Sequence, residues 1–422
     1  MQFRQLELAN ALSAIIGVDG DIPLIFDDAL YYDGEDETMS DYHVDAFQGA
    51  MQFVDIKKSI AELTSDQNTL NTISSELLKH ATKRCSLIRA SYEIISEAEE
   101  YEELASLALK NGLLNDFLIG NKHQKASWRL RLRQYGSMSN NGKEKRYGKN
   151  MRSPLSQERN AVNQMKDLFI NFGGNVSLKN PDCSLYVFEG LKGRKKILAK
   201  LITKGPNISS IAPKTRICVT NTPLCPIASY NMCNLARVKP NDKILDPFAG
   251  SCTVLLATAM ISPSCQTVGI EIAHNGIVNR DNIIRDFESR NLTPPAAIIK
   301  GDCTNTTVRD MAREAVDNMD FDLIITDPPY GIRERSGGGC SEDEPLDQLC
   351  KVIRDDRIKG KRLLKKGGRL IAFVPNIPGE NIYDALPDRE LLKEAGLNIL
   401  EMMEQPLNDA LSRWLVSFNC IL

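Results

Sequence analysis

From residue 216 onward, strand-type and helix-type segments alternate along the chain, and this pattern constrains the fold more than any other feature. Such an alternation is typical of an α/β domain built on a mostly parallel sheet. The predicted strands are 243–246, 266–270, 296–299, 321–326 and 369–374, and the predicted helices are 226–237, 253–261, 274–290, 346–364 and 387–395. Two closing runs, 397–403 and 413–421, predict an antiparallel hairpin that completes the sheet.

The first predicted strand of this domain ends in a tight turn of mostly small residues, 246–253, with the sequence D-P-F-A-G-S-C-T. Small residues let the backbone approach a ligand closely, and the helix that follows presents unpaired N–H groups and its positive dipole end. The Pro-Phe pair after the acid is unlike the glycine pattern of a dinucleotide-binding turn. Six residues are predicted to contact a cofactor: Asp246, Pro247, Phe248, Ala249, Gly250 and Ser251.

Acidic residues also follow the next two predicted strands. Glu271 ends the second strand, where a carboxylate suits two hydrogen bonds from a ribose diol. Asp302 follows the third strand, where it can accept a hydrogen bond from an adenine amino group. Either residue alone could be an ordinary strand-end carboxylate, but the carboxyl ends of parallel strands meet at one edge of a sheet. Together with Asp246, these acids predict a cofactor that contains adenosine.

The fourth predicted strand delivers Asp327-Pro328-Pro329-Tyr330 to the same edge. An amine on an aromatic ring is a poor nucleophile because its lone pair is delocalised, and two acceptors on its N–H groups favour a more nucleophilic nitrogen. The Asp327 carboxylate and the Pro328 carbonyl can be those acceptors, held in place by the two prolines. Tyr330 can stack on a base that has left its helix. All four residues are predicted to be catalytic, with Asp327 also beside the cofactor, and a plain Pro-Pro turn is the alternative.

The first half of the chain mixes helix-type and strand-type segments, as in small α+β units. The predicted helices are 3–16, 70–81, 97–118 and 156–172, and the predicted strands are 86–95, 128–133, 184–189 and 196–203. Residues 128–133 alternate between apolar side chains and arginines, which predicts a half-buried strand with three arginines on its wet face. We expect exposed loops at the acidic stretch 19–45 and at 140–152.

A basic region spans residues 122–152, with ten Lys or Arg residues against the single acid Glu144. The whole chain has a net charge of −3, so this local positive charge is hidden in the total. A nearly neutral net charge therefore does not exclude a polyanionic partner. Lysine and arginine gain from neutralising nucleic-acid phosphates, while a merely solvated basic face is an equal alternative. The residues predicted to contact RNA are Arg129, Arg131, Arg133, Lys143, Lys145 and Arg146.

The eleven cysteines and four histidines show neither metal-ligand spacing nor a Cys-x-x-Cys pair, so the sequence predicts reduced thiols and no metal site. No apolar run approaches the 20 or so residues of a membrane span. The N-terminus lacks the basic start and apolar block of a secretory signal. We therefore expect a cytoplasmic protein.

The residues from Asp327 to Tyr330 resemble the DPPY motif of class I S-adenosylmethionine-dependent amino-methyltransferases. More narrowly, the chain is similar to the catalytic subunit of THUMP-containing tRNA guanosine-10 N2-methyltransferases. The segments that carry this narrower resemblance are 327–334 (D-P-P-Y-G-I-R-E), Asn221-Thr222 before the helix that reaches Asn234, Ser412-Arg413, 176–181 (V-S-L-K-N-P) and the strand that begins at Trp128.

This resemblance implies a ferredoxin-like domain over 1–95, a THUMP RNA-binding domain over 96–215 and a Rossmann-like, seven-stranded methyltransferase domain over 216–422. It also implies S-adenosylmethionine as cofactor, tRNA as substrate and a small zinc-binding activator subunit as partner in a heterodimer. The implied reaction is methyl transfer to the exocyclic N2 amine of a guanosine. Two alternatives stay open: an amine on another RNA or DNA base, or a non-catalytic paralogue that binds RNA.

Three positions depart from the family pattern. Cys252 replaces the second glycine of the usual D-P-F-x-G-T-G turn, and Cys225 stands where the family has an acid in T-S-M-D-A. A usual Gly-Arg in the THUMP region is Ala199-Lys200 here. If position 252 requires a positive φ, a residue other than glycine costs about 1–2 kcal/mol. If this cost weakens cofactor binding, the affinity for the cofactor falls by about tenfold.

Overall fold

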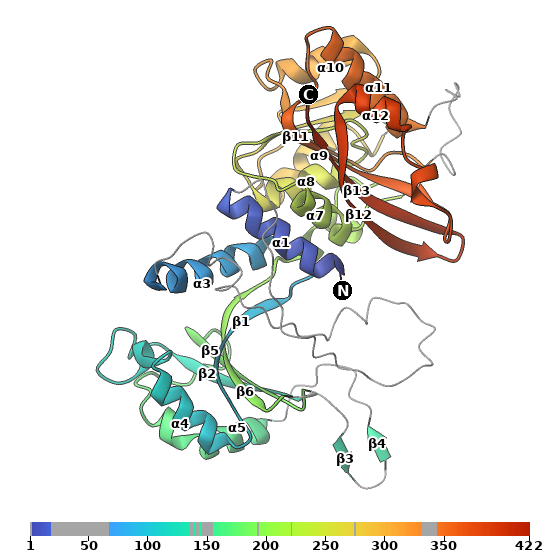
Figure 1. Cartoon of the computed structure of the whole chain (residues 1–422). Helices are drawn as coiled ribbons and strands as arrows, with labels where there is room; N and C mark the ends of the chain where they lie inside the picture. Colours follow the sequence, from blue (N-terminus) through green and yellow to red (C-terminus); the bar gives the residue numbers. More distant parts are fainter. Residues whose placement is uncertain are drawn as a thin grey trace. The chain divides into compact units, whose positions relative to one another are not determined.

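The computed structural model describes residues 2–17, 67–134, 138–140, 143–145, 155–191, 194–220, 222–273, 276–330 and 344–422 (Figure 1). The chain divides into two compact units. Among the described residues, the N-terminal unit contains 67–82 and 88–205. The C-terminal unit contains 2–17, 83–87 and 206–422. These units divide the chain differently from the predicted boundaries at 95 and 215, and the assignment of three named domains stays a prediction.

The C-terminal unit is built on a seven-stranded sheet with the order β12-β13-β11-β10-β7-β8-β9 (Figure 1). Its strands are β7 (Lys243–Asp246), β8 (Gln266–Glu271), β9 (Ala297–Lys300), β10 (Phe321–Thr326), β11 (Leu364–Asn376), β12 (Leu397–Asn408) and β13 (Leu411–Cys420). All neighbours from β11 to β9 run parallel, and β13 is antiparallel to both β11 and β12. The α/β fold with a mostly parallel sheet and a closing antiparallel hairpin is therefore confirmed.

The strand order reverses between β7 and β10. From β7 the chain moves outward through β8 and β9, and it then returns to place β10 and β11 on the other side of β7. In open α/β sheets, ligands bind outside the carboxyl ends of the strands at such a reversal. The fold thus marks the ends of β7 and β10 as the place for a site.

Helices cover both faces of this sheet. They are α7 (Pro226–Leu235), α8 (Thr253–Ile261), α9 (Arg280–Glu288), α10 (Thr306–Glu314), α11 (Pro345–Ile358) and α12 (Arg389–Ala395), with 3₁₀ helices η3 (Ile208–Ile211), η4 (Pro213–Thr215) and η5 (Ile382–Asp384). Successive strand residues point to opposite faces, so Ile244 packs in the core formed with α7, α8 and α9, while Leu245 packs in the core formed with α10, α11 and α12. Strands buried on both faces explain the nearly continuous apolar runs in the sequence.

Helix α1 (Gln2–Ile16) belongs to the C-terminal unit, where it packs against α7. Its Glu7 is 3% exposed and accepts hydrogen bonds from the backbone N–H groups of Ser86 (2.7 Å) and Leu87 (2.9 Å) and from Asn234 Nδ2 (3.1 Å). The helix was predicted correctly from its apolar spacing. A sequence pattern of this kind gives no information on which domain such a helix joins.

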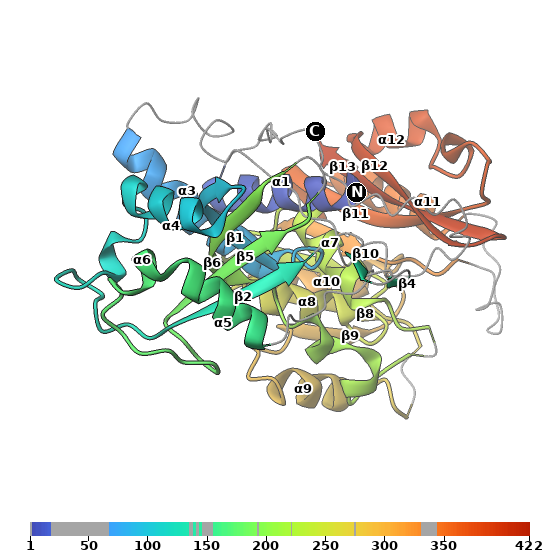
Figure 2. The ribbon, with the colours of Figure 1, turned by 90° about the horizontal axis from the view of Figure 1, so that it is seen from below.

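The N-terminal unit contains a four-stranded sheet with the order β1-β6-β5-β2. Its strands are β1 (Ala90–Ala98), β2 (Trp128–Gln134), β5 (Cys183–Glu189) and β6 (Lys196–Lys204), and its helices are α4 (Tyr101–Asn111), α5 (Leu155–Gln164) and α6 (Lys166–Phe169), with η2 (Asn115–Phe117). Helices α4 and α5 lie along one face of this sheet (Figure 2), where their core includes Leu104, Leu130 and Leu185. Helix α3 (Gln67–Arg84) precedes β1.

Several predicted elements need correction. Helix α10 (Thr306–Glu314) was not predicted, because its apolar stripe is short. The clearest sequence signal for its start is Asn305, whose side-chain oxygen accepts a hydrogen bond from Thr307 N at 2.9 Å. The predicted helix 346–364 ends at Ile358, since Gly360 adopts a left-handed backbone (φ 74°) just after it, and Leu364 already belongs to β11. The predicted helix 156–172 is two short helices, α5 and α6. The predicted loop 140–152 contains the strand β4 (Lys143–Lys145), paired with β3 (Met138–Asn140).

The predicted helices 97–118 and 274–290 are too long, because β1 extends to Ala98 and α4 spans Tyr101–Asn111, while α9 spans Arg280–Glu288. The other predicted strands and helices are present with small shifts of their ends, and β7, α8 and β10 have the predicted bounds. Among the described residues, no helix combines the length and the apolar character needed to cross a membrane. The acidic stretch 19–45 lies outside the described residues.

Candidate active site

Four acidic residues line the carboxyl edge of the seven-stranded sheet. Parallel pairing sets Asp246 beside Gly269 and Glu271 beside Lys300, and it sets the β7 residue Leu245 beside Ile324 of β10. Asp327, Asp246, Glu271 and Asp302 therefore follow the ends of four adjacent strands in that order. The predicted meeting of the strand-end acids is confirmed, and it lies at the reversal of strand order.

Asp246 joins the two central strands at this edge. Its Oδ1 accepts hydrogen bonds from Thr326 Oγ1 (2.7 Å) and from the backbone N–H of Phe248 (3.2 Å). Burial of this side chain, with the negative charges of Asp327 and Glu271 nearby, raises the pKa of Asp246 to about 7. The carboxyl group can therefore hold a proton in neutral solution.

Glu271 ties the turn after β7 to the end of β8. Its Oε2 accepts a hydrogen bond from Gly250 N (2.7 Å), and its Oε1 accepts one from Ala273 N (2.7 Å). The turn is also held by Ala249 N, which donates to the Ile270 carbonyl at 2.9 Å. A carboxylate oxygen has two lone pairs, so each oxygen of Glu271 retains the capacity to accept from a ribose hydroxyl.

Cys252, at the end of this turn, has a left-handed backbone with φ 58° and ψ 36°. The sequence-based condition on position 252 is therefore met: a residue with a Cβ occupies a conformation that favours glycine. The side chain is fully buried. Gly269 on β8 makes room for it, because a Cβ there would lie 3.3 Å from Cys252 Sγ and 3.0 Å from Ala249 Cβ. Burial also raises the pKa of the Cys252 thiol, which stays uncharged.

A buried arginine, Arg216, holds the same turn from outside. Its Nη2 donates to the Ser251 carbonyl (2.5 Å) and its Nη1 to Thr253 Oγ1 (3.0 Å). Its Nε pairs with the fully buried carboxylate of Asp286, which also binds Arg290 Nη1 at 2.7 Å. Sequence reasoning missed this clamp because Arg216, Ser251 and Asp286 are far apart in the chain.

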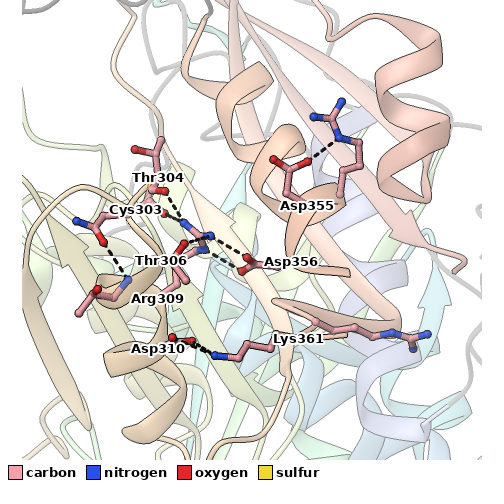
Figure 3. Close-up of polar contacts among 12 residues, drawn as sticks. Cys303, Thr304, Thr306, Arg309, Asp310, Asp355, Asp356 and Lys361 are labelled. Atoms are coloured by element: carbon pink, nitrogen blue, oxygen red, sulfur yellow. Dashed lines mark hydrogen bonds and ion pairs between the residues drawn. The ribbon is translucent and has the colours of Figure 1, made fainter. Parts of the chain in front are cut away.

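A second buried arginine, Arg309, holds the loop that carries Asp302 (Figure 3). Its Nη1 donates to the carbonyls of Cys303 (2.9 Å) and Thr304 (2.7 Å). Its Nε and Nη2 form a bidentate pair with Asp356 of α11 at 2.8 and 2.7 Å. Asp302 itself is exposed, and its Oδ1 accepts from Thr304 N at 2.8 Å. The loop is thus fixed through its backbone while the Asp302 carboxylate faces solvent.

The end of β10 carries a different kind of cluster. Tyr330 Oη donates to Asp327 Oδ1 at 2.5 Å, and Arg413 Nη1 donates to Tyr330 Oη at 3.0 Å. The same arginine nitrogen lies 3.7 Å from Asp327 Oδ2. Burial, followed by the charge of Asp327, raises the pKa of Tyr330 well above its usual range, so the phenol remains a donor. In the sequence, Arg413 stands out only as part of the Ser412-Arg413 segment that resembles the family. No sequence pattern indicates that its side chain reaches Asp327.

The residues predicted to bind RNA lie in the N-terminal unit, and the three arginines of β2 have partners within the protein. Arg129 and Arg131 donate to the Leu178 carbonyl at 3.1 and 3.3 Å, and Arg131 also pairs with Glu158 at 2.9 Å. The Arg133 guanidinium lies 5.7 Å from the centre of the Tyr186 ring. For Lys143 and Lys145 only the β4 backbone is described, and Arg146 lies outside the described residues. Their RNA contacts stay a prediction.

Two of the departures from the family pattern can also be placed. Cys225 is exposed and precedes α7 without a side-chain cap. Lys200, on β6, pairs with Glu93 of β1 at 2.7 Å. No group of His, Cys, Asp or Glu side chains among the described residues has the arrangement of a metal site.

Comparison with known proteins identifies the domain that holds this edge. The UPF0020 family, described as an RMKL-like methyltransferase domain, matches residues 213–342, which include the turn after β7, Glu271, Asp302 and Asp327–Tyr330. Residues 213–342 thus resemble the methyltransferase domain of this family. The predicted resemblance of this part of the chain to methyltransferases is thereby confirmed.

The chain is also a homologue of proteins named tRNA (guanine(10)-N(2))-methyltransferase TRMT11. The Xenopus laevis protein is 27% identical over 294 residues, which cover 61% of this chain and 59% of the relative. The Homo sapiens protein is 24% identical over 390 residues, which cover 83% of this chain and 78% of the relative. The match thus spans less than two thirds of the frog protein's length. Among solved structures, TrmN from Thermus thermophilus aligns over 79% of this chain and 82% of its own, with 18% identity and a TM-score of 0.35.

Proposed function

We propose that this protein transfers a methyl group from S-adenosylmethionine to the exocyclic N2 amine of a guanosine in tRNA, with position 10 as the expected site. One observation carries the proposal. At the reversal of strand order, Asp327-Pro328-Pro329-Tyr330 stands directly beside a glycine turn and a row of strand-end acids. The homology to TRMT11 proteins supports tRNA guanosine as the substrate.

The residues at the carboxyl edge fit the adenosine part of S-adenosylmethionine. Glu271 retains lone pairs for the ribose hydroxyls, and the exposed Asp302 carboxylate can accept from the adenine amino group. The turn around Gly250 brings backbone close to the ligand, at the N-terminus of α8. When bound, this cofactor supplies an electrophilic methyl group. We assign cofactor contacts to Asp246, Pro247, Phe248, Ala249, Gly250, Ser251, Glu271, Asp302 and Asp327.

Asp327 and Pro328 would prepare the amine. The Asp327 carboxylate and the Pro328 carbonyl each accept one N–H of the amine, which favours a pyramidal nitrogen whose lone pair points toward the methyl group. The new nitrogen–carbon bond would form as the bond between the methyl group and the cofactor's sulfonium sulfur breaks, which leaves a neutral thioether. The nitrogen would then give up one proton, which Asp327 could accept and pass to water. Tyr330 would stack on the guanine ring, which must first leave its base pair.

The N-terminal half would bind the tRNA. We keep the assignment of a ferredoxin-like domain over 1–95 and a THUMP domain over 96–215, with the methyltransferase domain over 216–422. The basic residues of β2 and β4 are proposed phosphate contacts, although Arg131 would have to share its charge with Glu158. A small zinc-binding activator subunit is the proposed partner, and the cytoplasm the proposed location.

The main competing hypothesis is a non-catalytic paralogue that binds RNA. It is favoured by two departures from the family pattern: Cys252, which adopts the left-handed backbone where the family has glycine, and Cys225, which stands where the family has an acid. Calorimetric titration of the purified protein with S-adenosylmethionine, with and without the activator subunit, separates the two. Binding in the micromolar range supports the enzyme, and no binding under either condition contradicts it.

Mass spectrometry of tRNA nucleosides from knockout cells tests the substrate. We expect the N2-methylguanosine content of purified tRNA species to fall, and complementation with the wild-type gene to restore it. An unchanged N2-methylguanosine content would remove the guanosine assignment, and the loss of another methylated nucleoside would name the amine that replaces it.

A further inference from the structure

We propose that Arg413 is a positioning residue for the substrate amine, and that it acts through Tyr330 on Asp327. This inference rests on the proposed function, which it extends by a residue outside the Asp-Pro-Pro-Tyr sequence. Arg413 belongs to the closing hairpin of the sheet, 83 residues beyond Tyr330 in the chain. Three observations support the inference: how Arg413 is held, what it binds, and which charges surround it.

The guanidinium of Arg413 is fixed by groups from β11 and β12, the two strands that flank β13. Arg413 pairs in register with Pro375 of β11 and Gln405 of β12. Its Cζ lies 3.8 Å from the centre of the Phe373 ring, and its Nε donates to Gln405 Oε1 at 2.8 Å. The residue is 7% exposed. A planar guanidinium stacked on one ring and bonded at Nε has little freedom left, so Nη1 is aimed at one place.

That place is the Tyr330 hydroxyl. The phenol oxygen accepts from Arg413 Nη1 and donates to Asp327 Oδ1, which makes a directed chain of two hydrogen bonds. Such a chain strengthens each bond, because the cation polarises the hydroxyl toward the carboxylate. The chain fixes the direction of the Tyr330 hydroxyl, the Tyr330 ring plane and one oxygen of Asp327. These are the two side chains that would hold the base and its amine.

The charges around Asp327 give Arg413 a second effect. The titratable and charged groups near Asp327 include Tyr330, Arg413 and the buried Asp246 at the end of β7. Asp246 and Asp327 repel each other when both are charged, and the positive charge of Arg413, 3.7 Å from Asp327 Oδ2, offsets part of that repulsion at Asp327. A carboxylate that must accept an N–H hydrogen bond needs this balance. The alternative is that Arg413 only stabilises the hairpin.

A double-mutant cycle separates these roles. The four proteins are the wild type, Arg413→Gln, Tyr330→Phe and the double variant, assayed with tRNA and S-adenosylmethionine in the presence of the activator subunit. Arg413→Gln should lower kcat by about 10–100-fold through misplacement of the reacting groups, with little change in the KM for S-adenosylmethionine. Because the arginine acts through the hydroxyl, the double variant should be no slower than the slower single variant. Arg413→Lys, which keeps a cation, should recover part of the loss.

Two controls distinguish a positioning role of Arg413 from a role in stability alone. Arg369→Gln removes another arginine of the same sheet, on β11, which pairs in register with Asn419 and whose Nη1 binds the Leu235 carbonyl. It should leave kcat unchanged even if it lowers stability. The same double-mutant cycle is also measured by urea unfolding, which needs no substrate. There the double variant should lose less in its unfolding midpoint than the sum of the two single losses.

The inference is overturned if the two substitutions act independently. In that case the kcat loss of the double variant equals the product of the two single losses. If the protein shows no turnover, the drop in the unfolding midpoint of the double variant equals the sum of the two single drops. A kcat loss in Arg369→Gln equal to that in Arg413→Gln would also overturn it, because hairpin stability would then explain both. Absence of methyl transfer by the wild type contradicts the proposed function instead, and the unfolding cycle then decides the contact between Arg413 and Tyr330.

Discussion

The two ends of the candidate site are held in different ways. At the cofactor end, Arg216 and Arg309 are each paired with a buried aspartate and bind backbone carbonyls, at Ser251 and at Cys303 and Thr304. At the substrate end, Arg413 binds the side chains of the predicted catalytic residues. Ligand contacts made by a loop's backbone require a fixed loop, whereas chemistry at an amine requires fixed side chains. The difference separates residues that should affect binding from residues that should affect turnover.

The largest effect is expected from a substitution that disrupts only the substrate end of the site. Asp327→Asn keeps the size of the side chain but removes the carboxylate that would accept the amine proton. We expect kcat to fall by about 10²–10⁴-fold, with the Kd for S-adenosylmethionine changed much less. Methyl transfer to tRNA and calorimetric titration measure the two quantities.

The matched variant at the cofactor end is Asp302→Asn. It should weaken S-adenosylmethionine binding by about tenfold, the value of one hydrogen bond to a charged group, and leave kcat at saturation nearly unchanged. If both variants changed the same quantity, the division of the site into two ends would be wrong.

The second prediction concerns the clamp on the glycine turn. Arg216→Met leaves Asp286 buried with Arg290 as its remaining cation and frees the Ser251 carbonyl. We expect the free energy of unfolding to fall by about 3–5 kcal/mol. Urea unfolding measures this loss. The double variant Arg216→Met/Asp286→Leu should recover part of it, and a double variant less stable than Arg216→Met would contradict the assignment of a paired charge.

The third prediction follows from the raised pKa of Asp246. The folded protein holds this proton up to a pH of about 7, whereas the unfolded chain releases it near its ordinary, lower pKa. Burial of Asp246 therefore costs nothing at acid pH, and the cost develops as pH rises toward 7. Asp246→Asn, which retains an acceptor for Thr326, should gain stability relative to the wild type by about 1–4 kcal/mol between pH 4.5 and 8. Unfolding curves of both proteins at these two pH values test the sign.

The smallest expected effect concerns Cys252. Since the left-handed backbone already exists in the fold, its cost reduces folding stability and not cofactor affinity, in contrast to the sequence-based expectation of a tenfold affinity loss. The matched pair is Cys252→Ala and Cys252→Gly, which both remove the thiol but differ in the backbone penalty. We expect the glycine variant to be more stable by about 1 kcal/mol. Equal stability would show that position 252 carries no strain.

Local patterns in the sequence predicted the elements that bear the site. The bounds of β7, α8 and β10 follow from apolar runs that end at an acid or begin after a small-residue turn, and these signals lie within a few residues of each boundary. Helix α10 was missed because its apolar stripe is short. The four acids could be placed on one edge because the carboxyl ends of parallel strands share it, whereas their order along that edge required the observed strand order.

The contacts that fix the site could not be predicted in the same way. Arg216 meets Asp286 across 70 residues, Arg309 meets Asp356 across 47, and Arg413 meets Tyr330 across 83. No periodicity relates such partners, because they are selected by packing in three dimensions. The same limit explains why α1 was predicted as a helix but not as part of the C-terminal unit.

The most direct test of the central claim is a methyl-transfer reaction with purified components. The protein and the activator subunit are incubated with unmodified tRNA and S-adenosylmethionine that carries an isotopically labelled methyl group, and the tRNA is digested for mass spectrometry of its nucleosides. We predict label in N2-methylguanosine for the wild type and its loss in Asp327→Asn. Label in another nucleoside, or no label while S-adenosylmethionine binds, would contradict the account.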